Sequence, residues 1–156
     1  MIMAVFSAIP TATAEAFRRG APDAFGNEPE HAISPGPGTP CRHCLKNIPE
    51  GEAMLVLAYK PFEGTHAYSE VGPIFLCAKA CERGGGHDLP PVLTTTPDYL
   101  IKGYSSDERI VYGTGVVTLT SELEARLDTI FADPDVAYIH VRSARNNCYQ
   151  ARVDRG

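Results

Sequence analysis

The stretch that decides the fold is Cys41-Arg-His-Cys44, which is answered further along the chain by Cys77-Ala-Lys-Ala-Cys81. Four of the five cysteines therefore fall into two close pairs. Such pairs are typical of Zn²⁺ sites, because two ligands on one tight turn lose little extra chain entropy when they bind the ion. The spacing predicts a zinc site with Cys41, Cys44, Cys77 and Cys81 as its ligands. Four thiolates make a closed, structural site, which the pattern favours over a three-cysteine site with an open position for Lewis-acid chemistry.

The residues around the two pairs predict a knuckle, a hairpin and a short helix. Pro49 and Gly51 follow the first pair before the chain becomes apolar. Ala53–Tyr59 and Pro73–Cys77 are expected to be strands that pair as a hairpin. Ala78–Arg83 is predicted as a short helix, which would place the second pair on one helix face. This order of elements resembles treble-clef zinc modules.

Two other interpretations of the cysteines remain open. Free cysteine is among the most buried residue types, so Cys77 on its apolar strand can be a plain core residue. Cys41 and Cys44, with Arg42 and His43 between them, can be a redox pair, because nearby positive charge lowers the pKa of a thiol. A thioredoxin-type pair, however, follows a strand and opens a helix, whereas this pair follows a loop rich in proline and glycine. His43 is expected to be exposed.

The chain is predicted to form a single α+β domain over residues 1–156, mostly antiparallel sheet with two longer helices. The apolar start faintly resembles a signal peptide but lacks a charged segment, so Met3–Ile9 is interpreted as a strand. Thr11–Arg19 is predicted as a helix that Gly20 ends. Residues 21–40 are expected to be a loop within the domain, because prolines and glycines recur there.

The second half of the chain predicts one more long helix and two hairpins. Ser121 and Glu124 have the spacing of a capping box, and an apolar stripe from Leu123 to Phe131 follows, so a helix is expected that stops before Asp133. The remaining strands are predicted at Tyr99–Tyr104, Arg109–Gly113, Val136–Arg142 and Cys148–Val153.

The last hairpin carries the candidate catalytic residues Cys148, His140 and Arg142. Strand alternation places His140 and Arg142 on one face, and pairing of Arg142 with Cys148 adds that cysteine and Arg152 to it. Such a group can be a thiol nucleophile with its base, or a surface that binds a carboxylate or phosphate. The simpler interpretation, which we favour, is that these residues populate the solvated face of an antiparallel sheet.

Composition excludes several classes of function. A net charge of −5 and no basic cluster argue against nucleic acid as a partner. No apolar run approaches the length of a membrane span. Because the apolar start lacks the charged segment of a signal peptide, a cytoplasmic protein is expected. In a reducing cytosol an odd number of cysteines favours metal, reactive thiols or burial over disulfides. The small-molecule or protein partner is not written in the sequence, and the exposed polar sheet faces would serve a homodimer as readily as a ligand.

Three blocks of sequence carry a resemblance to a known family: Pro40-Cys-Arg-His-Cys-Leu45; Gly72-Pro-Ile-Phe75 with Ala80-Cys-Glu-Arg83; and Tyr138-Ile-His-Val-Arg142 with Cys148-Tyr149 and Val153-Asp-Arg155. Together they resemble domain of unknown function 1203, a bacterial family, over essentially the whole chain. The family has no established activity, so the resemblance implies none. It does imply that Cys41, Arg42, His140, Arg142 and Cys148 share a pocket, if the knuckle lies over the terminal hairpin.

These observations predict a small cytosolic binding or accessory module with a structural zinc site. The alternative is a thiol-dependent enzyme that uses Cys41 or Cys148 with His140. The two differ in a measurable way, because a structural site has inert thiols and loses its fold on chelation, whereas a thiol enzyme has one cysteine that alkylates quickly.

Overall fold

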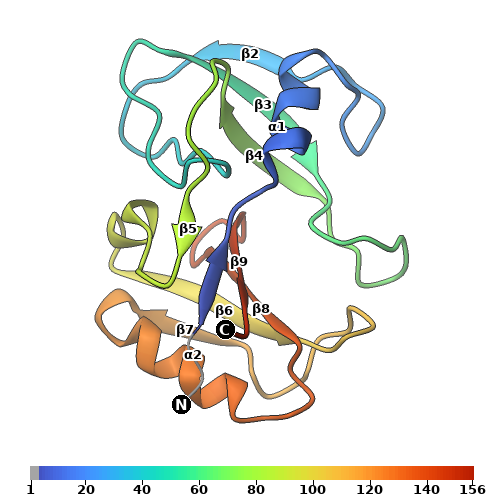
Figure 1. Cartoon of the computed structure of the whole chain (residues 1–156), viewed down its shortest axis with the longest axis vertical. Coiled ribbons are helices and arrows are strands. Elements are labelled where there is room, and N and C mark those ends of the chain that lie inside the picture. Colours follow the sequence, from blue (N-terminus) through green and yellow to red (C-terminus); the bar gives the residue numbers. More distant parts are fainter. Residues whose placement is uncertain (1–3) are drawn as a thin grey trace.

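The chain forms two antiparallel sheets, a small one above a large one in the view of Figure 1. The structure is a computed structural model that describes residues 4–156. The small sheet has the order β2-β3-β4, with β2 at Glu30–Ile33, β3 at Ala53–Tyr59 and β4 at Gly72–Cys77. The large sheet has the order β5-β1-β9-β8-β6-β7. Its strands are β1 (Val5–Ser7), β5 (Gly85–Gly86), β6 (Asp98–Tyr104), β7 (Val116–Leu119), β8 (Tyr138–Ser143) and β9 (Tyr149–Asp154). The predicted α+β class, mostly antiparallel, is confirmed.

Each sheet carries one of the two predicted helices. Helix α1 (Thr11–Arg18) lies against the small sheet and ends before Gly20, whose φ of 92° is the expected left-handed stop. Helix α2 (Leu123–Phe131) lies against the large sheet. The predicted capping box is wrong, because a 3₁₀ turn, η2 (Thr120–Glu122), precedes α2 and no side chain caps it. A second 3₁₀ turn, η1, spans Pro91–Thr94. No helix within residues 4–156 is both long and apolar enough to cross a membrane.

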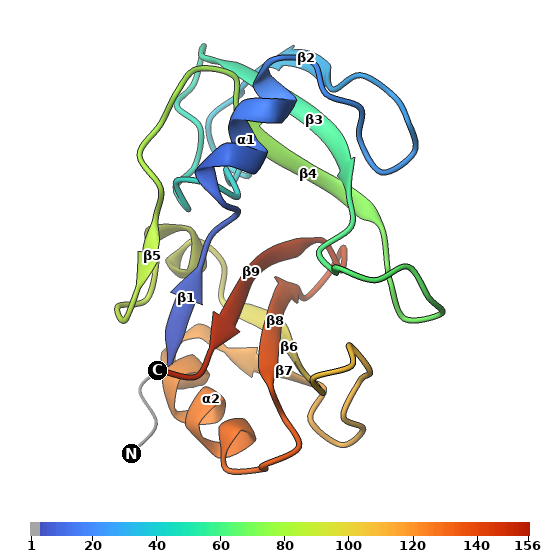
Figure 2. The ribbon, with the colours of Figure 1, turned by 45° about the vertical axis from the view of Figure 1, so that its right-hand side comes forward.

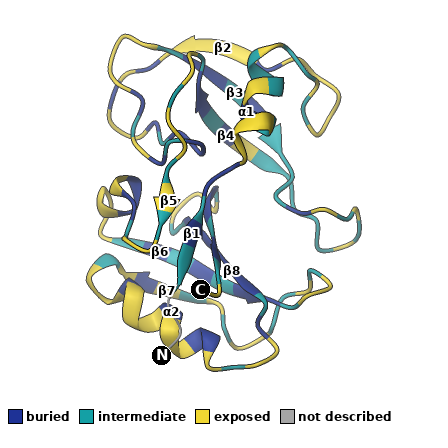
Figure 3. Ribbon diagram, in the orientation of Figure 1, coloured by how far each residue is buried: buried dark blue, intermediate teal, exposed yellow. Residues whose placement is uncertain are grey.

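Besides a small cluster of Phe62, Tyr104 and Tyr138, the core has two large apolar clusters. The larger one lies between the large sheet and α2, where Ile139 and Val141 of β8 meet the predicted stripe of Leu123, Leu127 and Phe131, all of them buried. The smaller one joins Ala14 of α1, the knuckle and strands β3 and β4. In Figure 3 the exposed residues of α2 lie on its outer side and β2 is exposed throughout.

The short helix predicted at Ala78–Arg83 is wrong. The segment is extended and irregular, because it has to run from the small sheet to the edge of the large one, where Gly85 pairs with Ser7. A helix advances about 1.5 Å per residue against about 3.3 Å in an extended chain, so a helix would not span this distance. Arg83 holds the extended path by donating from Nη2 to the carbonyl of Ala8 at 2.6 Å.

Two strand predictions also differ from the structure. Arg109–Gly113 is not a strand but contributes a single bridge, between Ile110 and Tyr104. Its neighbour Glu108 has a φ of 64°, which breaks an extended run, and β6 pairs instead with the later β7. Strand β2 was not predicted, because its four exposed residues between two prolines show no alternation of polar and apolar side chains.

The terminal hairpin forms as predicted, but with another register and in another environment. Arg142 pairs with Tyr149 rather than with Cys148, through an irregularity between Val141 and Arg142. The face that carries His140 and Arg142 is not solvated: these side chains are 0% and 4% exposed. The segment between β3 and β4 folds back over this face, which Figure 2 shows to the right of β8. The favoured interpretation of a solvated polar face is therefore wrong.

Candidate metal centre and the buried face beside it

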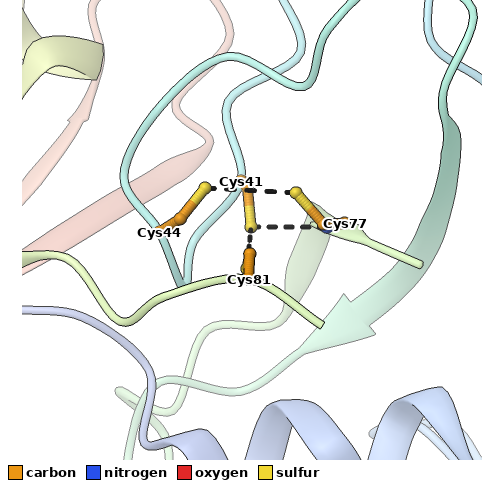
Figure 4. A group of neighbouring side chains, drawn as sticks. All are labelled: Cys41, Cys44, Cys77 and Cys81. Atoms are coloured by element: carbon orange, nitrogen blue, oxygen red, sulfur yellow. Dashed lines mark hydrogen bonds between the residues drawn. The ribbon is translucent and has the colours of Figure 1, made fainter. Parts of the chain in front are cut away.

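The two cysteine pairs meet in one cluster. The Sγ atoms of Cys41, Cys44, Cys77 and Cys81 all lie within 4.8 Å of one another, and Figure 4 shows the four side chains converging. Cys41 and Cys81 are 4.0 Å apart, as are Cys44 and Cys77, and all are free thiols. A tetrahedral site with Zn–S bonds of about 2.3 Å has sulfur–sulfur edges of about 3.8 Å. The cluster therefore fits one tetrahedral ion with small movements of the side chains.

The knuckle is formed by a tight turn that presents backbone N–H groups to sulfur. The amide of Leu45, a residue with a φ of 57°, donates to the carbonyl of Cys41 at 2.9 Å. The amide of Arg42 donates to Phe75 of β4 at 3.1 Å, which brings the knuckle alongside the strand that ends at Cys77. Cys41 Sγ accepts from two backbone amides, those of residues 43 and 77, at 3.4 and 3.3 Å. This turn places the first pair beside the second.

The thiols titrate as a group. Hydrogen bonds from the side chains of Cys44 and Cys77 lower the pKa of Cys41, and backbone N–H groups add to this effect. The same contacts raise the pKa of Cys44 to about 12 and also raise that of Cys77, while burial raises that of Cys81. Four thiols this close cannot all ionise by themselves, because each thiolate disfavours the next. A divalent cation at the centre of the four sulfurs would replace the thiol protons. Four thiolates are the ligands of a site for zinc or a similar thiophilic ion.

A second layer of donors surrounds Cys81. Arg18 of α1 donates from Nη2 to Cys81 Sγ at 3.1 Å and from Nε to the carbonyl of Cys77 at 2.9 Å. His43 Nδ1 lies 3.0 Å from Cys81 Sγ, and its Nε2 lies 2.8 Å from the hydroxyl of Thr11. With the proton on Nδ1, the ring donates to sulfur and accepts from Thr11. Such partners orient the ligands of metal sites and offset thiolate charge.

The donors around Cys81 were not predicted from the sequence. His43 was expected to be exposed, but its exposed fraction is 0%, and burial together with Arg18 lowers its pKa so that the ring stays neutral. Arg18 and Thr11 lie at the two ends of α1, far from the cysteines in sequence. The only signal in the sequence was that Thr11 and Arg18 are seven residues apart, a spacing that places both on one helix face.

Arg42 joins the knuckle to the terminal hairpin. Its guanidinium is buried and donates to the carbonyls of Tyr149 and Pro40, both at 2.7 Å, and lies 5.6 Å from the centre of the Phe75 ring. Burial lowers its pKa to about 10, so the group remains charged at neutral pH. The knuckle therefore contacts the start of β9, which was the condition for the shared pocket that the family resemblance implied.

The candidate catalytic residues lie on the hairpin without forming a nucleophile and base pair. Cys148 is half-buried in the turn, and its Sγ approaches the carbonyl of Asn146 at 3.8 Å. His140 is enclosed by aromatic rings, and within residues 4–156 neither of its nitrogens has a hydrogen-bond partner. Arg142 lies on the same buried face and donates to the carbonyl of Asn147 at 3.1 Å. The structure therefore groups His140 with Arg142, and assigns Cys148 to the turn.

Comparison with known proteins adds a family to this geometry. The searches of curated proteins and of solved structures gave no significant match. The model of a protein family of unknown function, DUF1203, matches residues 38–155, which include all four clustered cysteines and the whole terminal hairpin. Because the match spans most of the chain, this protein belongs to the DUF1203 family.

Proposed function

We propose that this protein is a small cytosolic binding module in which four thiolates hold one structural Zn²⁺. The observation that carries the proposal is the convergence of four free cysteine sulfurs within 4.8 Å, from two segments far apart in sequence. Thiolates select soft or borderline ions, and four of them in a tetrahedron are typical of structural zinc. Five unpaired cysteines fit a reducing compartment.

A structural role follows from how closed the site is. Cys41 is fully buried, and its Sγ already accepts from two backbone amides, so a bound ion would have no open position for a substrate. The site ties together helix α1 through Arg18, the knuckle, the end of β4 and the segment leading to β5. Beside the knuckle, Gly84 donates its amide to the carbonyl of His43 at 2.8 Å, and Val92 donates to that of Leu45 at 3.0 Å. Metal binding would therefore stabilise the small sheet and the connections between the two sheets.

The alternative, a thiol enzyme, finds less support. Its nucleophile would be Cys41, which is buried inside the cluster, or Cys148, which has no hydrogen bond to a base among the described residues. His140 contacts aromatic rings instead of a thiol. Nucleophilic catalysis needs a base within hydrogen-bond reach of the nucleophile. The geometry thus favours a binding role.

The test is the zinc content of the full chain purified without a metal-affinity tag. We expect about one equivalent per chain in the wild type, and a marked fall in Cys41→Ser and in Cys81→Ser, because each loses one thiolate ligand. Cys148→Ser is the matched control, since it removes the one cysteine outside the cluster, and it should keep the wild-type content. A chelator should lower the thermal midpoint of the wild type and of Cys148→Ser alike.

Two results would overturn the proposal. One is a wild-type protein that contains no zinc and takes up none from a stoichiometric solution under reducing conditions. The other is equal zinc content in the Cys41, Cys81 and Cys148 variants, which would place the ion elsewhere.

A further inference from the structure

A polar face of the large sheet is buried beneath the segment that joins β3 to β4. Strand pairing sets His140 opposite Lys102 on one side and Arg152 on the other, and sets Tyr104 opposite Tyr138. Phe62 of the covering segment packs with its ring centre 5.4 Å from Tyr104 and 5.0 Å from His140. Glu70 of the same segment reaches Lys102 at 3.2 Å. The face is therefore enclosed between β6, β8, β9 and residues 60–71.

This face holds a concentration of unpartnered polar atoms. Among residues 4–156, six buried side-chain nitrogen and oxygen atoms have no hydrogen-bond partner. They are the hydroxyls of Tyr104 and Tyr138, both ring nitrogens of His140, and Nε and Nη2 of Arg142. An unsatisfied buried polar group costs about 1–3 kcal/mol, and proteins nearly always satisfy such groups. All six belong to two neighbouring strands, which indicates that the face is a binding site for a polar ligand.

Arg142 indicates which chemical group of the ligand the face would bind. Its side chain is 5% exposed, its Nη1 donates to Asn147, and Glu70 lies 3.7 Å from the same nitrogen. Its Nε and Nη2 atoms are buried and have no hydrogen-bond partner among the described residues. These two N–H groups are coplanar and parallel, a geometry that matches the two oxygens of a carboxylate.

The charged residues on the face favour a ligand with a particular net charge. Glu70 is shared between Lys102 and Arg142, at 3.2 and 3.7 Å, while Arg152 pairs with Asp154 at 2.8 Å. Glu108 also lies near Tyr138 and pairs with His66 at 3.1 Å. Among the other five charged groups there is one more cation than anion, an excess of one positive charge. A single negative charge would balance it, whereas a dianion such as phosphate would leave an excess charge in a buried site. A planar monoanion therefore fits best.

Aromatic rings would surround the rest of the ligand. The ring of His140 lies between 4.7 and 5.2 Å, centre to centre, from those of Phe62, Tyr104, Tyr138 and Tyr149. Two cavities border this cluster: one of about 530 Å³, lined by Phe62, Tyr149 and Arg152 among others, and one of about 420 Å³, lined by Tyr138 and Arg152 among others. Both volumes lie in the range of small-molecule sites, although His140 and Arg142 line neither. Glu63 borders both cavities, and Phe62, which borders the first, packs directly against His140.

We propose that this face binds a small monocarboxylate with an apolar or aromatic body. The two carboxylate oxygens accept from Nε and Nη2 of Arg142, and His140 and the two tyrosine hydroxyls complete the polar contacts. Phe62 and Glu63 have to move aside for entry. Burial keeps His140 neutral and raises the pKa of Tyr138, so these groups can serve as uncharged hydrogen-bond partners. This inference rests on the proposed binding role but not on zinc.

The test is a titration of the zinc-saturated full chain, labelled with ¹⁵N-arginine, followed through the Nε–H signals. Arg142→Lys identifies the Arg142 signal and keeps the positive charge while removing the planar fork. Acetate and benzoate are the probes, with benzamide and inorganic phosphate as comparisons. We expect a carboxylate to shift the Arg142 signal downfield, and benzamide and phosphate to leave it unchanged. Affinity should fall by at least about tenfold in Arg142→Lys, because a charge-assisted bidentate contact is lost.

Arg145→Lys is the matched control. Arg145 lies in the turn of the same hairpin, but it is exposed and pairs with Asp98 at 2.9 Å, so its replacement should leave carboxylate affinity unchanged. The inference is overturned if neither acetate nor benzoate moves the Arg142 signal, if both arginine variants bind equally, or if phosphate produces the larger shift. Should Arg142→Lys fail to fold, the shifts of the buried Nε–H signals in the wild type decide the question alone. Zinc content measured on the same sample separates failure of this inference from failure of the zinc proposal.

Discussion

Replacing His140 by phenylalanine tests whether His140 stays unprotonated in the folded protein. The ring is 0% exposed, and its pKa is held well below the ordinary value of 6.5, first by burial and then by the positive charges of Arg142, Arg152 and Lys102. Tyr104, Tyr138 and Tyr149 also face the ring. The folded protein therefore keeps His140 neutral while the unfolded chain binds a proton below about pH 6.5.

The size of the effect follows from linkage. Because the unfolded state binds the extra proton, stability rises with pH, and it is lost as the pH falls through about 6.5. Between pH 7.5 and pH 5.5 this one residue should cost the wild type about 1.4 kcal/mol of unfolding free energy. His140→Phe fills a similar space among the rings and cannot take up a proton, so it should lack this loss. Differences in packing shift its stability equally at both pH values.

The assay is urea unfolding of both proteins at pH 7.5, 6.5 and 5.5 with saturating zinc. Only the change with pH of the difference between the two proteins is compared, because thiols and other histidines titrate alike in both and cancel. His140→Phe should gain about 1.4 kcal/mol on the wild type over this range. A constant difference across the three pH values would refute the reasoning, as would an NMR titration of the folded protein that shows His140 protonating near pH 6.5.

Three further changes separate the metal centre from the rest of the core. Gly84→Ala would place a Cβ 2.3 Å from the carbonyl oxygen of Cys44. It should therefore lower the free energy of unfolding by about 1–3 kcal/mol and speed the loss of zinc to a chelator. Gly72→Ala is the control, because its Cβ would meet nothing within 4 Å, and it should change neither quantity. Leu127→Ala removes a buried side chain from the cluster under α2 and should cost about 2–5 kcal/mol in urea unfolding while zinc content stays at the wild-type level. Arg18→Met removes the donor to a cysteine thiolate, so chelator competition should show zinc held about tenfold less tightly or worse, with little change in helix content by circular dichroism.

The sequence predicted those helices and strands whose formation depends on residues close together in the chain. The hairpin of β3 and β4, the two helices and the terminal hairpin all follow from runs of apolar residues with the period of a strand or a helix, and each forms with bounds close to those expected. The metal cluster was predictable for a similar reason. Close spacing puts each pair of cysteines on one turn or segment, and the hairpin between the pairs returns the chain to Phe75, whose bridge with Cys41 brings Cys41 beside Cys77.

What could not be predicted depends on contacts between distant segments. The segment 78–83 has good helix formers, but its ends are fixed by the knuckle and by β1, and this tertiary demand overrides propensity. His140 and Arg142 look like residues of a solvated face, because nothing in their own strands shows that Phe62 and Glu70 will cover them. The loop that does so carries no periodic pattern and lies some 70 residues earlier in the chain.

The place of β1 in the large sheet has a consequence for how the protein is made. This strand pairs with β9 at residues 152–154, so its partner is synthesised long after it. The four clustered cysteines, in contrast, all lie between residues 41 and 81, as do β3 and β4. Contacts of such long sequence separation form slowly, and chains fold as their segments emerge. The small sheet can therefore acquire its ion before β9 has been synthesised, and β1 pairs with β9 only afterwards.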